Sequence, residues 1–218
     1  MLCPECLNEY NNIKVRTCSV CFKDLNLCTC ANHYLKAHYI KSLVKVFRYA
    51  QRDDLPSNKL IYSLKRDNRK DVLDFLTNEL ETSIRASYKN VQSFVFTNVP
   101  RRRNSVIKYG IDHAALLSKS LAKRFSATYY QPIISQSKSQ QKKTSGEERI
   151  KNATFKLKRN AENLTGKTVI VLDDVVTTGA SMGACAMLLR GLGAKKIIGA
   201  SIAIAFKDEY TPFEYTWH

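Results

Sequence analysis

The sequence predicts an α/β protein whose parallel sheet is flanked by helices, with a small cysteine-rich metal-binding module at the N-terminus. Residues 168–206 have the pattern of a strand, a helix and a second strand, which is the βαβ unit of parallel sheets. Six of the seven cysteines lie within the first 30 residues, at spacings that suit a metal ion. We therefore expect a zinc-binding module at residues 1–33 and an α/β domain at residues 34–218.

The first four cysteines follow the spacing C-x2-C-x11-C-x2-C, which is typical of a zinc finger. Two such turns complete a tetrahedral site that is structural, because no position remains for a reactive water. The predicted zinc ligands are Cys3, Cys6, Cys18 and Cys21. Three interpretations remain for Cys28, Cys30 and His33: a second partial site, replacement of one ligand, or spare thiols under a loop, which we favour.

Strand and helix patterns alternate through the rest of the chain, as an α/β domain requires. Apolar runs predict strands at residues 43–49, 94–99, 128–134, 168–172 and 194–206. Apolar residues at helical spacing predict helices at residues 58–66, 69–85, 111–124 and 181–190. Residues 136–148 contain no apolar side chain, so we expect a long, polar, basic loop there. Such loops are usually functional or disordered, and this one would be both if it orders only over a ligand.

The strongest functional signal is the stretch VIVLDDVVTTGAS at residues 169–181. It predicts a buried strand that ends in Asp173 and Asp174, followed by a tight turn into a helix. The turn would direct backbone N–H groups, hydroxyls and the positive end of the helix dipole at an anion. The two carboxylates could accept hydrogen bonds from sugar hydroxyls or hold Mg2+. Together these features indicate a ribose 5-phosphate ligand.

This stretch resembles the binding motif for 5-phosphoribosyl pyrophosphate (PRPP) in type I phosphoribosyltransferases. The resemblance implies that Asp173 and Asp174 bind the ribose hydroxyls and take part in catalysis. It implies that the 5-phosphate is bound by Thr177, Thr178, Gly179, Ala180 and Ser181. It also implies that pyrophosphate and Mg2+ are bound at Val99, Pro100 and Arg101. The loop at residues 136–148 would then be the flexible catalytic hood.

The order of features along about residues 3–206 is similar to that of the ComF (ComFC) family of competence proteins. These features are the zinc module, the stretch LIYSLKRDNRKDVLDFL, an arginine cluster, GIDHAALLSKSLAKRF, the basic loop and the PRPP motif. The resemblance implies a role in natural transformation, in which the protein handles single-stranded DNA as it reaches the cytoplasm. The candidate protein partners are a competence helicase and the membrane DNA-uptake machinery.

The charge of the chain is strongly uneven. The formal net charge is +16, and residues 1–166 hold 30 basic and 14 acidic residues, whereas residues 167–218 hold 5 of each. A concentrated positive field indicates a polyanionic partner, although a solvated basic surface is the alternative. The candidate DNA-contacting residues are Arg101, Arg102, Arg103, Lys108, Lys138, Lys142 and Lys143.

Together these observations predict a competence protein that binds single-stranded DNA and carries a PRPP–Mg2+ site. The alternative is an active phosphoribosyltransferase that transfers ribose 5-phosphate to an unidentified acceptor. The first residues lack the pattern of a secretory signal, and no apolar run is long enough to span a membrane. We therefore expect a cytoplasmic protein, which partners could hold at the inner face of the membrane.

Overall fold

The computed structural model describes residues 2–49, 55–67, 69–101, 110–136 and 155–205. Five parallel strands form one sheet in the order β1-β7-β6-β2-β3. These strands are β1 (Ile40–Arg48), β2 (Val95–Asn98), β3 (Thr128–Tyr129), β6 (Thr168–Val176) and β7 (Lys196–Ile204). A small antiparallel pair consists of β4 (Ile133–Ser135) and β5 (Phe155–Leu157). The prediction of a parallel sheet flanked by helices is confirmed.

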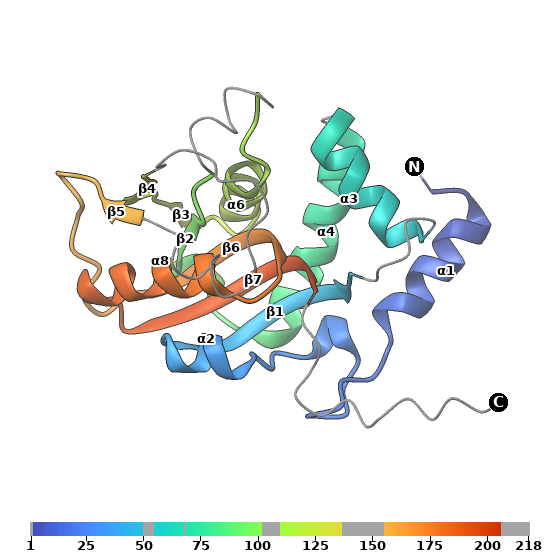
Figure 1. The fold of residues 1–218 in the computed structure, drawn as a ribbon, viewed down its shortest axis with the longest axis horizontal. Helices are drawn as coiled ribbons and strands as arrows, with labels where there is room; N and C mark the ends of the chain where they lie inside the picture. The colour runs from blue at the N-terminus through green and yellow to red at the C-terminus, as the bar shows by residue number, and fades with distance from the viewer. Residues whose placement is uncertain (1, 50–54, 68, 102–109, 137–154, 206–218) are drawn as a thin grey trace.

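Helices cover both faces of the sheet (Figure 1). The helices of the first face are α1 (Pro4–Lys14), α3 (Pro56–Asp67), α4 (Lys70–Ser87) and α6 (His113–Arg124). The helices of the second face are α2 (His33–Ala37) and α8 (Ala180–Gly191). Two short 3-10 turns occur at Leu25–Leu27 and Val91–Ser93. No helix within these described segments is long and apolar enough to cross a membrane.

The central strand β6 supplies side chains to the cores on both faces. Ile170 and Leu172 belong to the core under α4 and α6, while Val169 and Val171 belong to the core under α8. All four are fully buried, which explains why this segment is a continuous apolar run. The strand extends to Val176, whereas the predicted strand ended at residue 172. Asp173 and Asp174 therefore lie within the strand, near its carboxyl end, and not after it.

The first N-terminal residues form a helix and not the metal-binding turn that the cysteine spacing predicts. Pro4–Lys14 form helix α1, whose first turn is capped by Cys3: the Cys6 N–H donates to Cys3 Sγ (3.4 Å). Pro4 at the first helical position and Glu5 in the first turn favour a helix start here. The fully buried Tyr10 packs its ring against Phe47 and Phe75, so α1 is part of the main core.

The predicted strand at residues 128–134 is divided into β3 and β4. Pro132 has no N–H to donate to a neighbouring strand, so strand pairing is interrupted there. The Gln131 side chain forms hydrogen bonds at this interruption between β3 and β4. The Gln131 amide donates to the Asn98 carbonyl (2.8 Å), and its oxygen accepts from the Ile133 N–H (3.1 Å). The chain therefore leaves the main sheet at this point and pairs with β5.

Candidate functional site

A pocket of about 460 Å³ opens at the carboxyl ends of β2 and β6. It exists because β2 ends opposite Leu172, whereas β6 continues beside β7 to Val176. All ten predicted PRPP-binding residues line it: Val99, Pro100, Arg101, Asp173, Asp174, Thr177, Thr178, Gly179, Ala180 and Ser181. The structure thus brings together the two segments that sequence reasoning treated as separate loops.

The two carboxylates share a partly buried position at the end of β6. Asp173 Oδ1 accepts the Asp174 N–H (2.9 Å), and Asp174 Oδ1 accepts the Val175 N–H (2.7 Å). Burial and the neighbouring Asp174 carboxylate raise the pKa of Asp173 well above its usual range. A cation or a pair of hydroxyl donors would relieve this cost, so the arrangement suits Mg2+ or a ribose diol.

Lys65 is a pocket residue that sequence reasoning missed. It extends from the end of α3, and its ammonium lies 3.1 Å from Asp174 Oδ2. Only the tertiary packing of α3 beside β6 reveals this pairing, because nothing in the local sequence marks Lys65. The ammonium pairs with the Asp174 carboxylate and adds positive potential where phosphate groups would bind.

Asp112 and His113 are further pocket residues that were not predicted. Asp112 caps α6 by accepting the Ala115 N–H (3.0 Å), and its other oxygen accepts the Arg101 N–H (3.2 Å). Burial and the adjacent Arg101 lower the pKa of His113, which favours a neutral imidazole at this position. The Arg101 guanidinium donates to the Ile111 carbonyl (3.0 Å), so the loop after β2 is tied to the start of α6.

The turn after β6 has the geometry of an anion-binding loop. Gly179 adopts φ +87°, a left-handed conformation that favours glycine, and α8 begins at the next residue. Gly179 has no side chain with which to cap α8, so backbone N–H groups after Ala180 are left without a cap at the edge of the pocket. Thr178 Oγ1 accepts the Ala180 N–H (3.2 Å), which fixes the hydroxyl within the turn.

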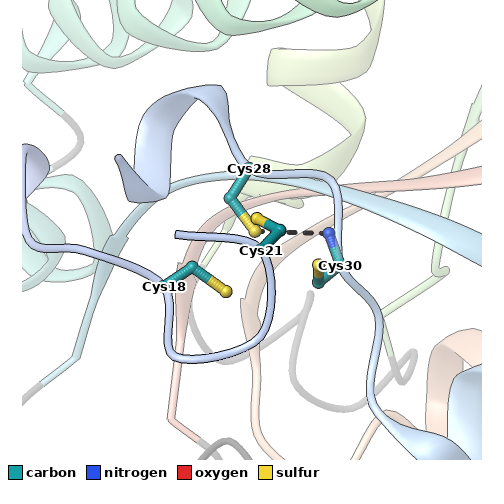
Figure 2. A group of neighbouring side chains, drawn as sticks. All are labelled: Cys18, Cys21, Cys28 and Cys30. Atoms are coloured by element: carbon teal, nitrogen blue, oxygen red, sulfur yellow. Dashed lines mark hydrogen bonds between the residues drawn. The ribbon is translucent and has the colours of Figure 1, made fainter. Parts of the chain in front are cut away.

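A group of four cysteines lies between the end of α1 and the start of α2. The sulfur atoms of Cys18, Cys21, Cys28 and Cys30 lie within 4.8 Å of one another, and Figure 2 shows the four side chains converging. Burial and the neighbouring cysteines raise the pKa of the Cys30 thiol. The cluster contains two of the predicted ligands, Cys18 and Cys21, but joins them with Cys28 and Cys30. Of the other two predicted ligands, Cys3 is the N-cap of α1 and Cys6 lies in its first turn.

The residues of this cluster fit a tetrahedral metal ion. A zinc ion bound to four thiolates needs Zn–S bonds of about 2.3 Å, hence sulfur atoms about 3.8 Å apart. The fully buried Lys45 directs its ammonium at Cys28 Sγ (3.1 Å) and the Cys30 carbonyl (2.8 Å). A buried ammonium is costly without a negative partner, and a metal bound by four thiolates carries net negative charge. The cluster could therefore hold a metal ion.

Of the predicted DNA-contacting residues, only Arg101 is described, at the pocket. The others lie outside the described residues, as does nearly all of the predicted hood. They are Arg102, Arg103, Lys108, Lys138, Lys142 and Lys143.

Comparisons with known proteins agree with this site. Residues 110–217 match the family model of the phosphoribosyl transferase domain. The chain therefore carries a phosphoribosyltransferase-type domain, and the carboxylates and the turn after β6 lie within it. The cysteine cluster, β1 and β2 precede the matched residues. A comparison with curated protein sequences found no match.

Several solved structures have a related arrangement at low sequence identity. A purine phosphoribosyltransferase from Pyrococcus horikoshii is 14% identical, with a TM-score of 0.40, over 67% of this chain and 93% of that one. An adenine phosphoribosyltransferase from Leishmania tarentolae is 9% identical, with a TM-score of 0.42, over 70% and 89%. A hypoxanthine phosphoribosyltransferase from Staphylococcus aureus is 11% identical, with a TM-score of 0.40, over 63% and 73%.

Single cysteine replacements distinguish the two ligand sets. We expect Cys28→Ser to reduce the bound metal of the purified protein and lower its melting temperature, because Cys28 lies in the cluster. Cys3→Ser is the matched control and should leave the metal content unchanged, because Cys3 lies on α1. Elemental analysis measures the bound metal of the two variants, and thermal unfolding measures their melting temperatures. Loss of metal from Cys3→Ser with retention in Cys28→Ser would instead support the ligand set predicted from the spacing.

The raised pKa of Asp173 predicts a pH-dependent effect on stability. The folded protein retains this proton to higher pH than the unfolded chain, so stability falls as pH rises above about 4, the unfolded value. We expect Asp173→Asn, measured without ligand, to melt at a higher temperature than the wild type at neutral pH. The difference should shrink as pH falls toward about 4. The exposed Asp67→Asn is the control, and a pH-independent difference would contradict the prediction.

Proposed function

We propose that the protein binds PRPP with Mg2+ in the pocket between β2 and β6. The observation that supports this most is the combination of two carboxylates and a helix N-terminal turn in one pocket, opposite the loop at Val99–Arg101. A phosphorylated ribose needs these two groups side by side: N–H donors for the phosphate and acceptors for the diol.

The proposed roles follow from the position of each residue. Residues 177–181 hold the 5-phosphate, and Asp173 and Asp174 hold the ribose hydroxyls. Val99, Pro100 and Arg101 bind the pyrophosphate together with Mg2+, which would neutralise its charge. Zinc in the cysteine cluster is structural.

The alternative is turnover, in which the same site acts as a phosphoribosyltransferase. The bond from the ribose C1 to the pyrophosphate oxygen would break, pyrophosphate would leave with its electron pair, and an acceptor would bond to C1. Asp173 and Asp174 would stabilise the positive charge that develops on the ribose. Release of pyrophosphate in the presence of the acceptor distinguishes this activity from binding alone.

We also propose that the protein binds single-stranded DNA during natural transformation. The support is the net charge of +16, which is more than a single phosphorylated sugar needs, together with the resemblance to competence proteins. A cytoplasmic protein of this kind would receive DNA from the membrane uptake machinery or a helicase. DNA binding and the PRPP site would then coexist in one molecule.

Binding of Mg-PRPP tests the site directly by isothermal titration calorimetry. We expect Asp174→Ala to weaken Mg-PRPP binding by roughly 10- to 100-fold, because it removes charge-assisted hydrogen bonds to the ribose or a carboxylate ligand of Mg2+. DNA affinity should be unchanged or higher, since a negative charge is lost. Asp67→Ala, an exposed acid at the end of α3, is the control. Equal affinity of Asp174→Ala and the wild type would overturn the assignment.

The salt dependence of single-stranded DNA binding tests the second proposal. If about six phosphates are neutralised, affinity should fall by roughly 10²–10³ between about 50 and 200 mM salt. Replacing Lys138, Lys142 and Lys143 by Gln should reduce the slope by about 2. Replacing Lys167, Lys195 and Lys196 by Gln removes the same charge from the neutral part of the chain and is the control. Fluorescence anisotropy measures both, and a flat salt response would contradict the proposal.

A further inference from the structure

The segment between the cysteine cluster and α2 contacts the proposed phosphate-binding turn directly. Only Ala31 separates Cys30, a member of the cluster, from Asn32, the residue that caps α2. Ala31 is buried in the same core as Leu35 and Met182, the latter in the first turn of α8. The two sites that sequence reasoning assigned to separate modules are therefore structurally adjacent.

Asn32 links α2 to the turn with a single side chain. Its Oδ1 accepts the Leu35 N–H (2.9 Å), which caps α2, and its Nδ2 donates to the Thr178 carbonyl (3.2 Å). The carbonyl oxygen and the following N–H point in opposite directions across a trans peptide. Holding the Thr178 oxygen toward Asn32 thus turns the Gly179 N–H away from Asn32, the direction an anion bound on the turn requires.

Leu35 and its neighbours fix the position of the turn from the same side. The Leu35 side chain is fully buried, and its atoms lie 2.8 Å from where a Cβ on Gly179 would be. Tyr34 and His38 approach Gly183 on α8 in the same way, at 3.0 and 3.1 Å from an added Cβ. The start of α8 is therefore seated against α2 with no room for a side chain between them.

The other end of this segment is held by β1, beside the cysteine cluster. The Leu43 N–H donates to the Thr29 carbonyl (2.9 Å), and the Lys45 ammonium donates to the Cys30 carbonyl (2.8 Å). The cluster has little apolar core of its own, since only Cys18, Leu25 and Cys28 form its buried group. Metal ligation would supply the missing stability through Cys28 and Cys30, so it would add to the bonds from β1 that position residues 28–32.

We propose that metal binding at the cysteine cluster and anion binding at residues 177–181 are coupled, with Asn32 and Leu35 as the positioning residues. The proposal rests on the proposed phosphate role of the turn. Because coupling is reciprocal, metal raises the affinity for the phosphorylated ligand, and the ligand raises the affinity for metal by the same factor. A factor of about 10 is in the usual range for such coupling.

Asn32→Ser is the decisive variant in the full chain. Serine retains an acceptor that can cap α2, but it is too short to donate to the Thr178 carbonyl. We expect zinc content and melting temperature close to wild type, with affinity for Mg-PRPP and ribose 5-phosphate about 10-fold weaker. Asn12→Ser, the same change on the exposed face of α1, is the matched control. If Asn32→Ser loses zinc, Asn32→Thr provides the same test with another capping residue.

Zinc affinity, measured by competition with a chelator, provides the reciprocal readout. Saturating ribose 5-phosphate should raise the zinc affinity of the wild type about 10-fold and leave that of Asn32→Ser unchanged. The coupling would be overturned if saturating ribose 5-phosphate left the zinc affinity of the wild type unchanged. It would also be overturned if Asn32→Ser bound Mg-PRPP and ribose 5-phosphate as tightly as the wild type. Binding of ribose 5-phosphate or inorganic phosphate without binding of Mg-PRPP would overturn the proposed function and leave the coupling testable. Absence of binding to all three ligands would overturn both.

Discussion

Unequal pairing along β6 creates the pocket in which we propose that PRPP binds. The strand pairs with β7 as far as Val176, but its pairing with β2 ends at Leu172. The missing neighbour leaves Asp173 and Asp174 partly buried beside an open volume instead of inside a closed ladder. The cost is visible in the raised pKa of Asp173. A sheet that keeps a carboxylate at such a position is less stable than it could be, and a bound cation or diol offsets the loss.

The N-terminal residues stabilise the domain on both of its faces. Tyr10 on α1 and Leu35 on α2 are fully buried, the first in the core under α4 and the second in the core under α8. The cysteine cluster lies between these two helices along the chain. A domain boundary at residue 33 stays a prediction, but this packing makes the N-terminal segment a structural support for the turn at residues 177–181 rather than an independent appendage.

The features that could be predicted from the sequence are those determined by neighbouring residues in the chain. Contacts between residues far apart in the sequence could not be predicted. The strand, acids and turn at residues 169–181 were predicted because apolar residues, two acids and a Gly-containing hydroxyl-rich turn follow one another within one short stretch. Spacing alone does not distinguish Cys3 from Cys28, whereas the structure groups Cys28 with Cys18 and Cys21. The helix-start signals at Pro4 and Glu5 favour the same grouping, because they place Cys3 at the cap of α1. Asp112 is recognisable as a helix cap, whereas the pairing of Lys65 with Asp174 requires the packing of α3.

The charges inside the pocket do not explain the charge of the whole chain. Lys65 and Arg101 face three carboxylates there, those of Asp112, Asp173 and Asp174, so the described pocket is close to balanced before any ligand binds. Mg2+ and backbone N–H groups are then sufficient for a sugar phosphate. The excess positive charge of residues 1–166 must therefore act outside the pocket, where long-range attraction of a polyanion needs no precise geometry. The two proposed binding activities therefore draw on different residues, apart from Arg101, which is a candidate for both.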